Sequence, residues 1–184
     1  MAQDEHLQDP HTSAEEQQEL WRKAQKLRFA MMTTQQPGGA LASRPMTLQG
    51  VDGDGTLWFF TAADTTLVED VHNDAALNVA FADPADDFYV SVSGLGHFQH
   101  DREKIEALWT PMAGAWFDGP HDPKLALLRV QPERVDYWKN ESGKLTQMAA
   151  MAKAALTNTR PGKGVGEHGS FVPPVSSGNG AGAH

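Results

Sequence analysis

Apolar and polar residues alternate in short stretches along most of this chain, a pattern that is typical of half-buried β-strands. The stretches are five to nine residues long and are bounded by Gly, Pro, Asn or Asp. Gly94 and Gly96 indicate a bend or bulge just before residues 97–99. The predicted strands span residues 26–34, 43–48, 57–61, 77–81, 88–94, 125–130 and 134–138.

Helical spacing replaces this alternation in four places. A capping box at Ser13–Glu16 predicts a helix over residues 14–25, and a second box at Thr66–Glu69 predicts a short helix just after a strand. Asp101 can cap a third helix. An apolar stripe predicts an amphipathic helix between residues 143 and 156.

The order of these elements predicts a mainly β fold with flanking helices. No strand-helix-strand unit repeats, so a small antiparallel barrel fits better than a doubly wound parallel sheet. We expect residues 1–12 to be a flexible N-terminus and residues 13–157 to form the domain. Residues 158–184 are rich in Gly, Pro and Ser and are predicted to be a flexible tail, because they carry too little apolar surface to offset the entropy of ordering.

Composition excludes several classes of protein. The formal charge of -9 and the pI near 5.2 argue against a nucleic-acid-binding surface, which needs a basic stripe. The chain has no cysteine, which rules out disulfides and thiolate chemistry. Its N-terminus does not resemble a signal peptide, and no apolar run is long enough to span a membrane. We therefore expect a soluble cytoplasmic protein.

The hairpin from Ser43 to Thr61 is the best candidate for a ligand site. Pro45 cannot donate to a strand ladder, so it must lie at an edge, at a bulge, or where a ligand takes the neighbouring backbone groups. Thr61 is followed by a helix start at Thr65 and Thr66, where hydroxyls and unpaired N–H groups suit a phosphate, and Arg44 could add a charged donor. Alternatively, the threonines only cap the helix and the arginine pairs with a surface carboxylate.

Catalytic motifs are missing elsewhere. The eight histidines show no spacing typical of a metal site, and Asp52–Gly55 reads as a hairpin turn because the glutamate that completes a calcium loop is absent. No nucleophile elbow, Walker loop or Rossmann fingerprint occurs. Any redox chemistry would therefore come from a cofactor. Trp116 in an irregular loop and Trp138 at a strand end are the aromatics best placed to border a flat ring.

Several motifs occur in an order that resembles a known family. They are Ser43–Met46, Leu57–Thr61, Tyr89–Gly94, the loop from Trp109 to Phe117, and Val135–Trp138. Together they resemble the general stress protein 26 branch of the pyridoxamine 5'-phosphate oxidase-like, FMN-binding split-barrel family. The resemblance covers roughly residues 14–157, about one domain.

The resemblance implies a split β-barrel homodimer that holds FMN at the subunit interface. Ser43, Arg44, Pro45 and Met46 would lie beside the flavin ring, Phe60, Thr61, Thr65 and Thr66 around the ribityl chain and phosphate, and Trp116 and Trp138 would approach the flavin from the partner subunit. Leu67 stands where the family commonly has a lysine. Losing that charged hydrogen bond, worth ~1.5–3 kcal/mol, predicts FMN binding weakened by roughly one to two orders of magnitude, and Leu67→Lys is expected to restore it.

The resemblance favours an FMN-binding general-stress-type protein with flavin-dependent oxidoreductase activity on an unidentified small molecule. A true pyridoxamine phosphate oxidase is disfavoured, because a second phosphate would need more basic residues than these motifs supply. One alternative is a stress protein that sequesters flavin or another ligand without turnover. A further alternative is a deazaflavin- or haem-binding relative on the same barrel.

Overall fold

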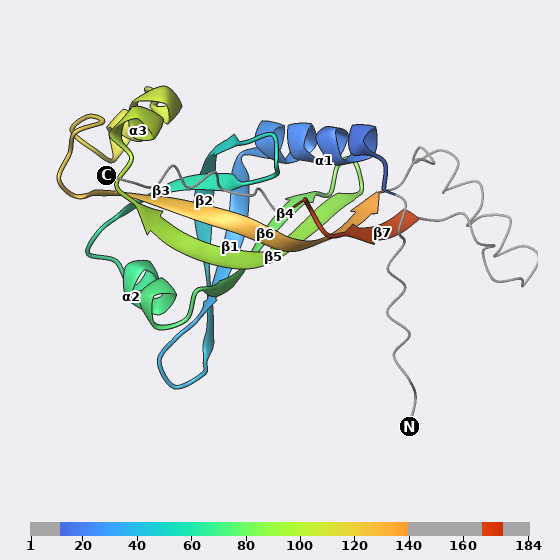
Figure 1. The fold of residues 1–184 in the computed structure, drawn as a ribbon, viewed down its shortest axis with the longest axis horizontal. Helices are drawn as coiled ribbons and strands as arrows, with labels where there is room; N and C mark the ends of the chain where they lie inside the picture. The colour runs from blue at the N-terminus through green and yellow to red at the C-terminus, as the bar shows by residue number, and fades with distance from the viewer. Residues whose placement is uncertain (1–11, 140–166, 175–184) are drawn as a thin grey trace, which may run out of the picture.

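A computed structural model describes residues 12–139 and 167–174 of the 184-residue chain (Figure 1). Within these residues the fold is one antiparallel seven-stranded sheet with three α-helices and a short 3-10 helix. The elements are α1 (Ala14–Leu27), β1 (Phe29–Gln35), β2 (Leu41–Val51), β3 (Leu57–Ala62), α2 (Thr66–Asn73), β4 (Ala76–Asp83), β5 (Phe88–Gln99), α3 (Arg102–Leu108), η1 (Ala113–Ala115), β6 (Leu125–Lys139) and β7 (Glu167–Phe171).

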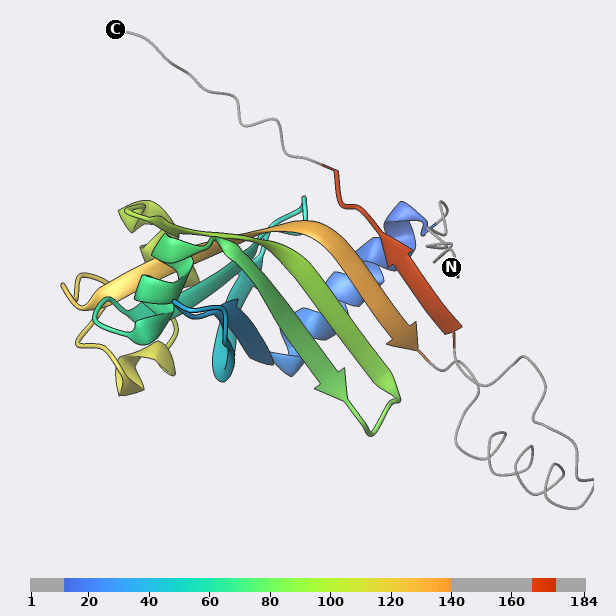
Figure 2. The same ribbon diagram turned by 90° about the horizontal axis from the view of Figure 1, so that it is seen from below.

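The sheet closes into a six-stranded barrel. Its strand order is β3-β2-β1-β4-β5-β6-β7, and β3 also pairs with the first half of β6, so the first six strands form a ring. Strand β7 lies outside the ring and pairs with the second half of β6, beside which it runs in Figure 2. Closure removes most exposed strand edges, and the predicted split-barrel fold is confirmed.

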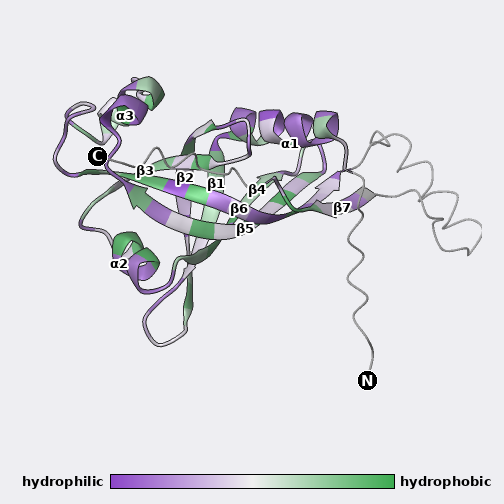
Figure 3. Ribbon diagram, viewed as in Figure 1, coloured by the Kyte–Doolittle hydropathy of each residue, from purple (hydrophilic) through white to green (hydrophobic). Residues whose placement is uncertain are grey.

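Inward-facing apolar side chains fill the barrel. Met32, Phe59, Val79 and Val92 are fully buried and come from four different strands. Helix α1 packs against β2 and β4 and adds Leu20, Trp21 and Ala24 to the same core. Its side that faces the viewer in Figure 3 is largely hydrophilic, as expected for an amphipathic helix on a barrel surface. The predicted Ser13–Glu16 capping box is present.

Two predicted strands are in fact one. Residues 125–130 and 134–138 both belong to β6, which continues through Gln131, Pro132 and Glu133. The register against β5 shifts at this point: Gly94 pairs with Pro132 but Ser93 pairs with Arg134. A β-bulge thus accommodates the proline where two separate strands were expected.

The prediction of a flexible tail over residues 158–184 is wrong for residues 167–171. These residues form β7, and Phe171 is buried against Trp21 and Tyr137, with ring centroids 6.2 and 6.4 Å away. A single large aromatic side chain supplies the apolar contact that composition alone did not reveal. The predicted helix at 143–156 lies outside the described residues, as do residues 1–11 of the predicted flexible N-terminus at 1–12.

None of the helices in the described part of the chain is long and apolar enough to cross a membrane. Helices α2 and α3 instead lie near one end of the long β5–β6 pair, and β7 lies at the other end (Figure 1). Helix α2 packs against β1 and β5, and its Leu67 and Val71 side chains enter the core. Two cavities, described below, lie at the end that carries α2 and α3.

Candidate functional site

The barrel opens where β2 and β3 separate. Residues 48–51 of β2 pair with β3, whereas residues 41–47 pair only with β1. On the other side, residues 60–62 of β3 pair only with β6. The start of β2 and the end of β3 therefore diverge, and each strand keeps an unpaired edge.

A cleft of about 350 Å³ lies between these two diverging strand halves. This volume is within the usual range for small-molecule sites. Its third wall is the segment between α3 and β6. The lining residues are Pro45, Met46, Thr47, Gln49, Phe60, Thr61, Ala62, Thr65, Met112, Ala113, Trp116 and Phe117.

Pro45 lies at an unpaired strand edge, which is one of the three positions predicted for it from the sequence. The Leu48 N–H donates to the Arg28 carbonyl on the β1 side at 2.7 Å. Because backbone groups alternate along a strand, the nitrogen of Pro45 and the N–H of Thr47 point away from β1, toward the open side. The proline therefore removes no ladder hydrogen bond. The Thr47 N–H on this open side has no partner strand among the described residues, whereas the Thr47 carbonyl accepts from the Gln49 side chain.

Gln49 places an unsatisfied acceptor in the cleft. Its side-chain nitrogen donates to the Thr47 carbonyl at 3.0 Å, but its buried Oε1 atom has no partner within the described residues. A buried carbonyl without a donor carries a desolvation penalty of ~1–3 kcal/mol. The atom is closed off from solvent, so a small rotation of the side chain would be needed before a ligand N–H or O–H could remove that penalty.

Hydroxyl groups and a helix start form the polar end of the cleft. The Thr61 and Thr65 hydroxyl oxygens lie 3.3 Å apart, and the Thr65 hydroxyl donates to the Ala62 carbonyl at 2.9 Å. The predicted capping box at Thr66 is wrong, because Thr65 is the N-cap and makes no side-chain bond to the helix. With no such cap, N–H groups at the start of α2 stay available to an acceptor.

Arg44 does not line the cleft. Its Nη2 atom donates to the carboxylate of Asp70 in α2 at 2.7 Å, and the Thr34 hydroxyl donates to the same oxygen at 2.7 Å. Burial raises the pKa of Asp70, but these hydrogen bonds outweigh it, and the pKa lies below its ordinary value of 3.8. The partner of Arg44 is thus a buried carboxylate and not the surface one that the alternative interpretation expected.

This ion pair fixes the two sides of the cleft relative to each other. Arg44 directly precedes the cleft residue Pro45, and Asp70 lies one helical turn beyond the start of α2. The Asp70 side chain is 2% exposed and that of Arg44 20%. The pair therefore has a positioning role, although the buried Nη1 atom of Arg44 has no partner among the described residues.

Leu67 does not face the cleft either. Its side chain is 1% exposed and belongs to the main core. The second residue of α2 points toward the barrel because Leu67 and Val71, four residues apart, lie on the same helix face. Leu67 itself therefore does not line the cleft, and the expected gain of affinity on Leu67→Lys stays a prediction.

The segment after α3 carries the predicted tryptophan Trp116. Its side chain is 83% exposed, yet it borders the cleft of its own chain. Trp138 lies elsewhere, near the end of β6, where it stacks on His168 of β7 with ring centroids 4.9 Å apart. Within one chain the two tryptophans are therefore not brought together.

Six of the ten residues predicted at the site line the cleft, and four do not. The six are Pro45, Met46, Phe60, Thr61, Thr65 and Trp116. Of the others, Ser43 is exposed and bonds Thr33 through their hydroxyls at 2.7 Å, and Thr66 is exposed at the first turn of α2. Gln49 and Met112 were missed, because neither a lone glutamine nor a loop methionine carries a recognisable motif.

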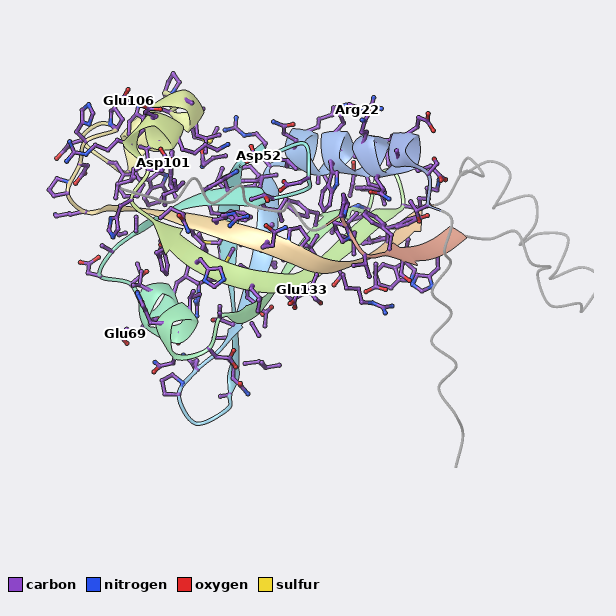
Figure 4. All side chains as sticks on the ribbon, in the orientation of Figure 1. Arg22, Asp52, Glu69, Asp101, Glu106 and Glu133 are labelled. Atoms are coloured by element: carbon purple, nitrogen blue, oxygen red, sulfur yellow. The ribbon has the colours of Figure 1, made fainter. Side chains whose placement is uncertain are left out.

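A second cavity, of about 370 Å³, lies between the end of β5, α3 and the loop before β6. It is more polar, with His100, Arg102, His121 and Asp122 on its walls. His121 lies 3.4 Å from Glu106, a residue of α3 labelled in Figure 4. Backbone N–H groups hold the pKa of Asp122 below its ordinary value.

Across the described residues, no group of three or more His, Asp or Glu side chains could hold a metal ion.

Comparison with known proteins agrees with this architecture. A family model described as pyridoxamine 5'-phosphate oxidase like matches residues 15–162. The protein bli-3 of Neurospora crassa is 30% identical over 141 residues, which cover 71% of this chain and 68% of that protein. General stress protein 26 of Bacillus subtilis is 26% identical over 83 residues, which cover 44% of this chain and 59% of that protein.

Solved structures show the same fold. A crystal structure described as a general stress protein 26 from Jannaschia sp. CCS1 superposes with a TM-score of 0.70 at 28% identity, over 87% of this chain and 99% of that one. The general stress FMN/FAD binding protein of Xanthomonas citri superposes with a TM-score of 0.61 at 32% identity, over 71% of this chain and 93% of that one. The chain belongs to the pyridoxamine 5'-phosphate oxidase-like family of split-barrel proteins.

Proposed function

We propose that this protein binds a flavin, FMN, in the cleft between β2 and β3. The observation that carries the proposal is the separation of these strands, which leaves, within the described residues, a strand edge without a partner strand beside Pro45 and a buried, unpartnered Gln49 Oε1 on the same wall. The family and the FMN/FAD-binding relative from Xanthomonas citri support the choice of ligand.

The chemistry of the cleft fits the two ends of this molecule. Phe60 and Met46 supply apolar surface for a ring system, and Gln49 can accept a hydrogen bond from a ring N–H. At the other end, the Thr61 and Thr65 hydroxyls and the start of α2 suit a phosphate. Because Leu67 is buried, these groups would hold the phosphate without a lysine at that position.

A bound flavin would supply the redox capacity, as a carrier of hydride or single electrons. The residues of the chain would bind, orient and desolvate it. None of the side chains that line the cleft is ionisable, so none can act as a general acid or base at neutral pH. We therefore assign the lining a binding role and expect any oxidoreductase activity to depend on the cofactor.

The same observation favours a second candidate, a flavin carrier without turnover. The two are separated by anaerobic mixing of the flavin-loaded protein with NADH or NADPH. Bleaching of the flavin band at a rate above that of free FMN would support an oxidoreductase. Free-FMN rates with both donors would support the carrier.

The flavin proposal is tested with purified protein. We expect either a flavin absorption spectrum as isolated, or saturable binding when FMN is added and its fluorescence is followed. Gln49→Leu removes the acceptor at similar size and should weaken binding by about 2- to 12-fold, the equivalent of ~0.5–1.5 kcal/mol. Gln18→Leu makes the same substitution at an exposed position of α1 and serves as the matched control. No bound flavin, and none recovered on titration to about 100 µM, would rule the proposal out.

A second copy of the chain is proposed to cover the outer face beside the cleft. Phe29 and Met31 of β1 are 63% and 45% exposed, and they lie opposite Thr47 and Pro45, which line the cleft. Large exposed apolar groups of this kind commonly mark an interface. Any partner on this face would touch the rim of the cleft, and this is how Trp138 could reach a flavin that its own chain does not hold.

Light scattering after size exclusion tests this assembly. We expect a dimer at micromolar concentration, and Met31→Glu should shift it toward monomer and weaken FMN binding together. Glu19→Gln, at an exposed position of α1, changes a surface charge outside the exposed face of β1 and should alter neither. The proposed assembly would be contradicted if the wild-type protein were a monomer and bound FMN no more tightly than the Met31→Glu variant.

A further inference from the structure

The third wall of the cleft is apolar and presents two side chains to solvent. Met112, Trp116 and Phe117 form this wall, in the segment between α3 and β6. Met112 is 45% exposed, and the Trp116 ring is the most exposed large apolar group of the described residues. We refer to these three residues as the tryptophan wall.

The backbone of the tryptophan wall is anchored even though the Trp116 ring is not. Ala113 is buried in a second small core with Trp58, Phe60 and Leu127, and Phe117 packs against it. The N–H groups of Trp116 and Phe117 both donate to the Ala113 carbonyl, at 3.0 and 3.1 Å. The segment therefore holds a large flat ring at the mouth of the cleft on a fixed support. A ring held this way can stack on a ligand at low entropic cost.

Two basic side chains near the cleft, those of Arg44 and Lys104, are paired with carboxylates outside it. Arg44 is held by the buried Asp70 on the other side of its strand. Lys104 in α3 lies 2.6 Å from the carboxylate of Asp52 and 4.7 Å from the centroid of the Trp58 ring. Asp52 belongs to the β2–β3 turn and lies on the side of the barrel that carries α3 (Figure 4). With no ionisable side chain in the lining and a net charge of -9, the lining itself offers an anion no counter-charge.

We propose, on the basis of the flavin site argued above, that the tryptophan wall binds a second ligand that is planar, aromatic and uncharged. The same wall discriminates against phosphorylated rings. A phosphate that entered this end would lose its hydration without gaining a cation. Stacking on Trp116 would retain a neutral ring. The polar end at Thr61 and Thr65 is then reserved for the phosphate of the flavin.

The test uses a matched pair of probes that differ only by a phosphate: 2-naphthol and 2-naphthyl phosphate. Both are fluorescent, so equilibrium dialysis measures their binding to the full-length chain, with and without added FMN. We expect 2-naphthol to bind at least tenfold more tightly than its phosphate ester. Trp116→Ala should weaken 2-naphthol binding about tenfold, as expected for loss of one stacked ring. Met112→Lys should bring the affinities for the two probes closer together, because the added ammonium would bind the phosphate of 2-naphthyl phosphate.

Val172→Ala is the control, since Val172 is an exposed apolar residue next to β7, at the other end of the molecule. Equal or tighter binding of 2-naphthyl phosphate, or unchanged 2-naphthol binding in Trp116→Ala, would overturn the proposal. Flavin content is measured separately by absorbance. If the flavin-loaded protein shows no preference for 2-naphthol over 2-naphthyl phosphate, only the proposal for the tryptophan wall is overturned. If the protein binds no flavin but keeps that preference, only the proposed function is overturned.

Discussion

The sequence and the structure predict opposite effects for the replacement of Leu67 by lysine. Sequence comparison predicts that Leu67→Lys restores a phosphate contact and tightens FMN binding. The structure predicts the opposite, because Leu67 is 1% exposed and lies in the main core. The variant should lose stability and should gain no affinity.

The magnitude follows from two contributions. Removing a fully buried leucine forfeits ~1.5–3 kcal/mol of apolar burial, and an unpaired ammonium in the core costs several kcal/mol more unless it becomes neutral or reaches water. We expect a total loss of ~3–5 kcal/mol in the free energy of unfolding. At ~2–4 °C per kcal/mol for a chain of this size, Tm should fall by roughly 6–20 °C.

Differential scanning calorimetry and fluorescence titration with FMN measure the two effects on one sample. Thr66→Lys is the matched control, because it adds the same charge one residue earlier on the exposed side of α2. It should change Tm by only a few degrees, and if the phosphate lies at this helix start it should tighten FMN binding. A Leu67→Lys protein with wild-type Tm and tighter FMN binding would refute the core position of Leu67.

Three further predictions test the elements around the site. The pKa of Asp70 is lowered on folding, so its ionised form stabilises the protein above about pH 4 and this contribution is lost as the pH falls through the folded value; Tm should therefore depend less on pH between 5 and 3 in Asp70→Asn than in the wild type. Phe171→Ala should destabilise by ~3–5 kcal/mol in urea unfolding, and a wild-type midpoint would mean that β7 does not pack as described. Gly94→Ala places a Cβ against the Gln131 carbonyl and should destabilise by ~2 kcal/mol or more, whereas Gly53→Ala meets no atom within 4 Å and should change the midpoint little.

Local patterns are sufficient to predict most elements. Alternation identifies the strands, and the Ser13–Glu16 capping box identifies the start of α1, because both depend on neighbours in sequence. The errors have a common origin in contacts distant in sequence. Pro132 lies inside one long strand because a bulge opposite Gly94 absorbs it. Phe171 orders a tail segment because Trp21 and Tyr137 receive it.

The site is predictable in the same uneven way. Pro45, Thr61 and Trp116 can be found because a proline in a strand, a hydroxyl before a helix and a tryptophan in a loop are each locally unusual. Sequence reasoning places Arg44 with them, but its partner Asp70 lies 26 residues away and cannot be identified from spacing. The order of the motifs identifies the family, but the pairing of the strands determines which side chains reach the cleft.

The position of the cleft follows from the closure of the barrel. Strand β3 must pair with β2 on one side and with β6 on the other to complete the ring, but only residues 57–59 of β3 do both. Beyond Phe59 the strand follows β6, while residues 41–47 of β2 stay with β1. Two unpaired strand edges thus face each other across the cleft, where a proline causes no loss of ladder hydrogen bonds and where a ligand can bind backbone groups. The proline at position 45 is therefore compatible with the fold only because the barrel is split there, and for the same reason a proline within this strand pattern indicates the position of the site.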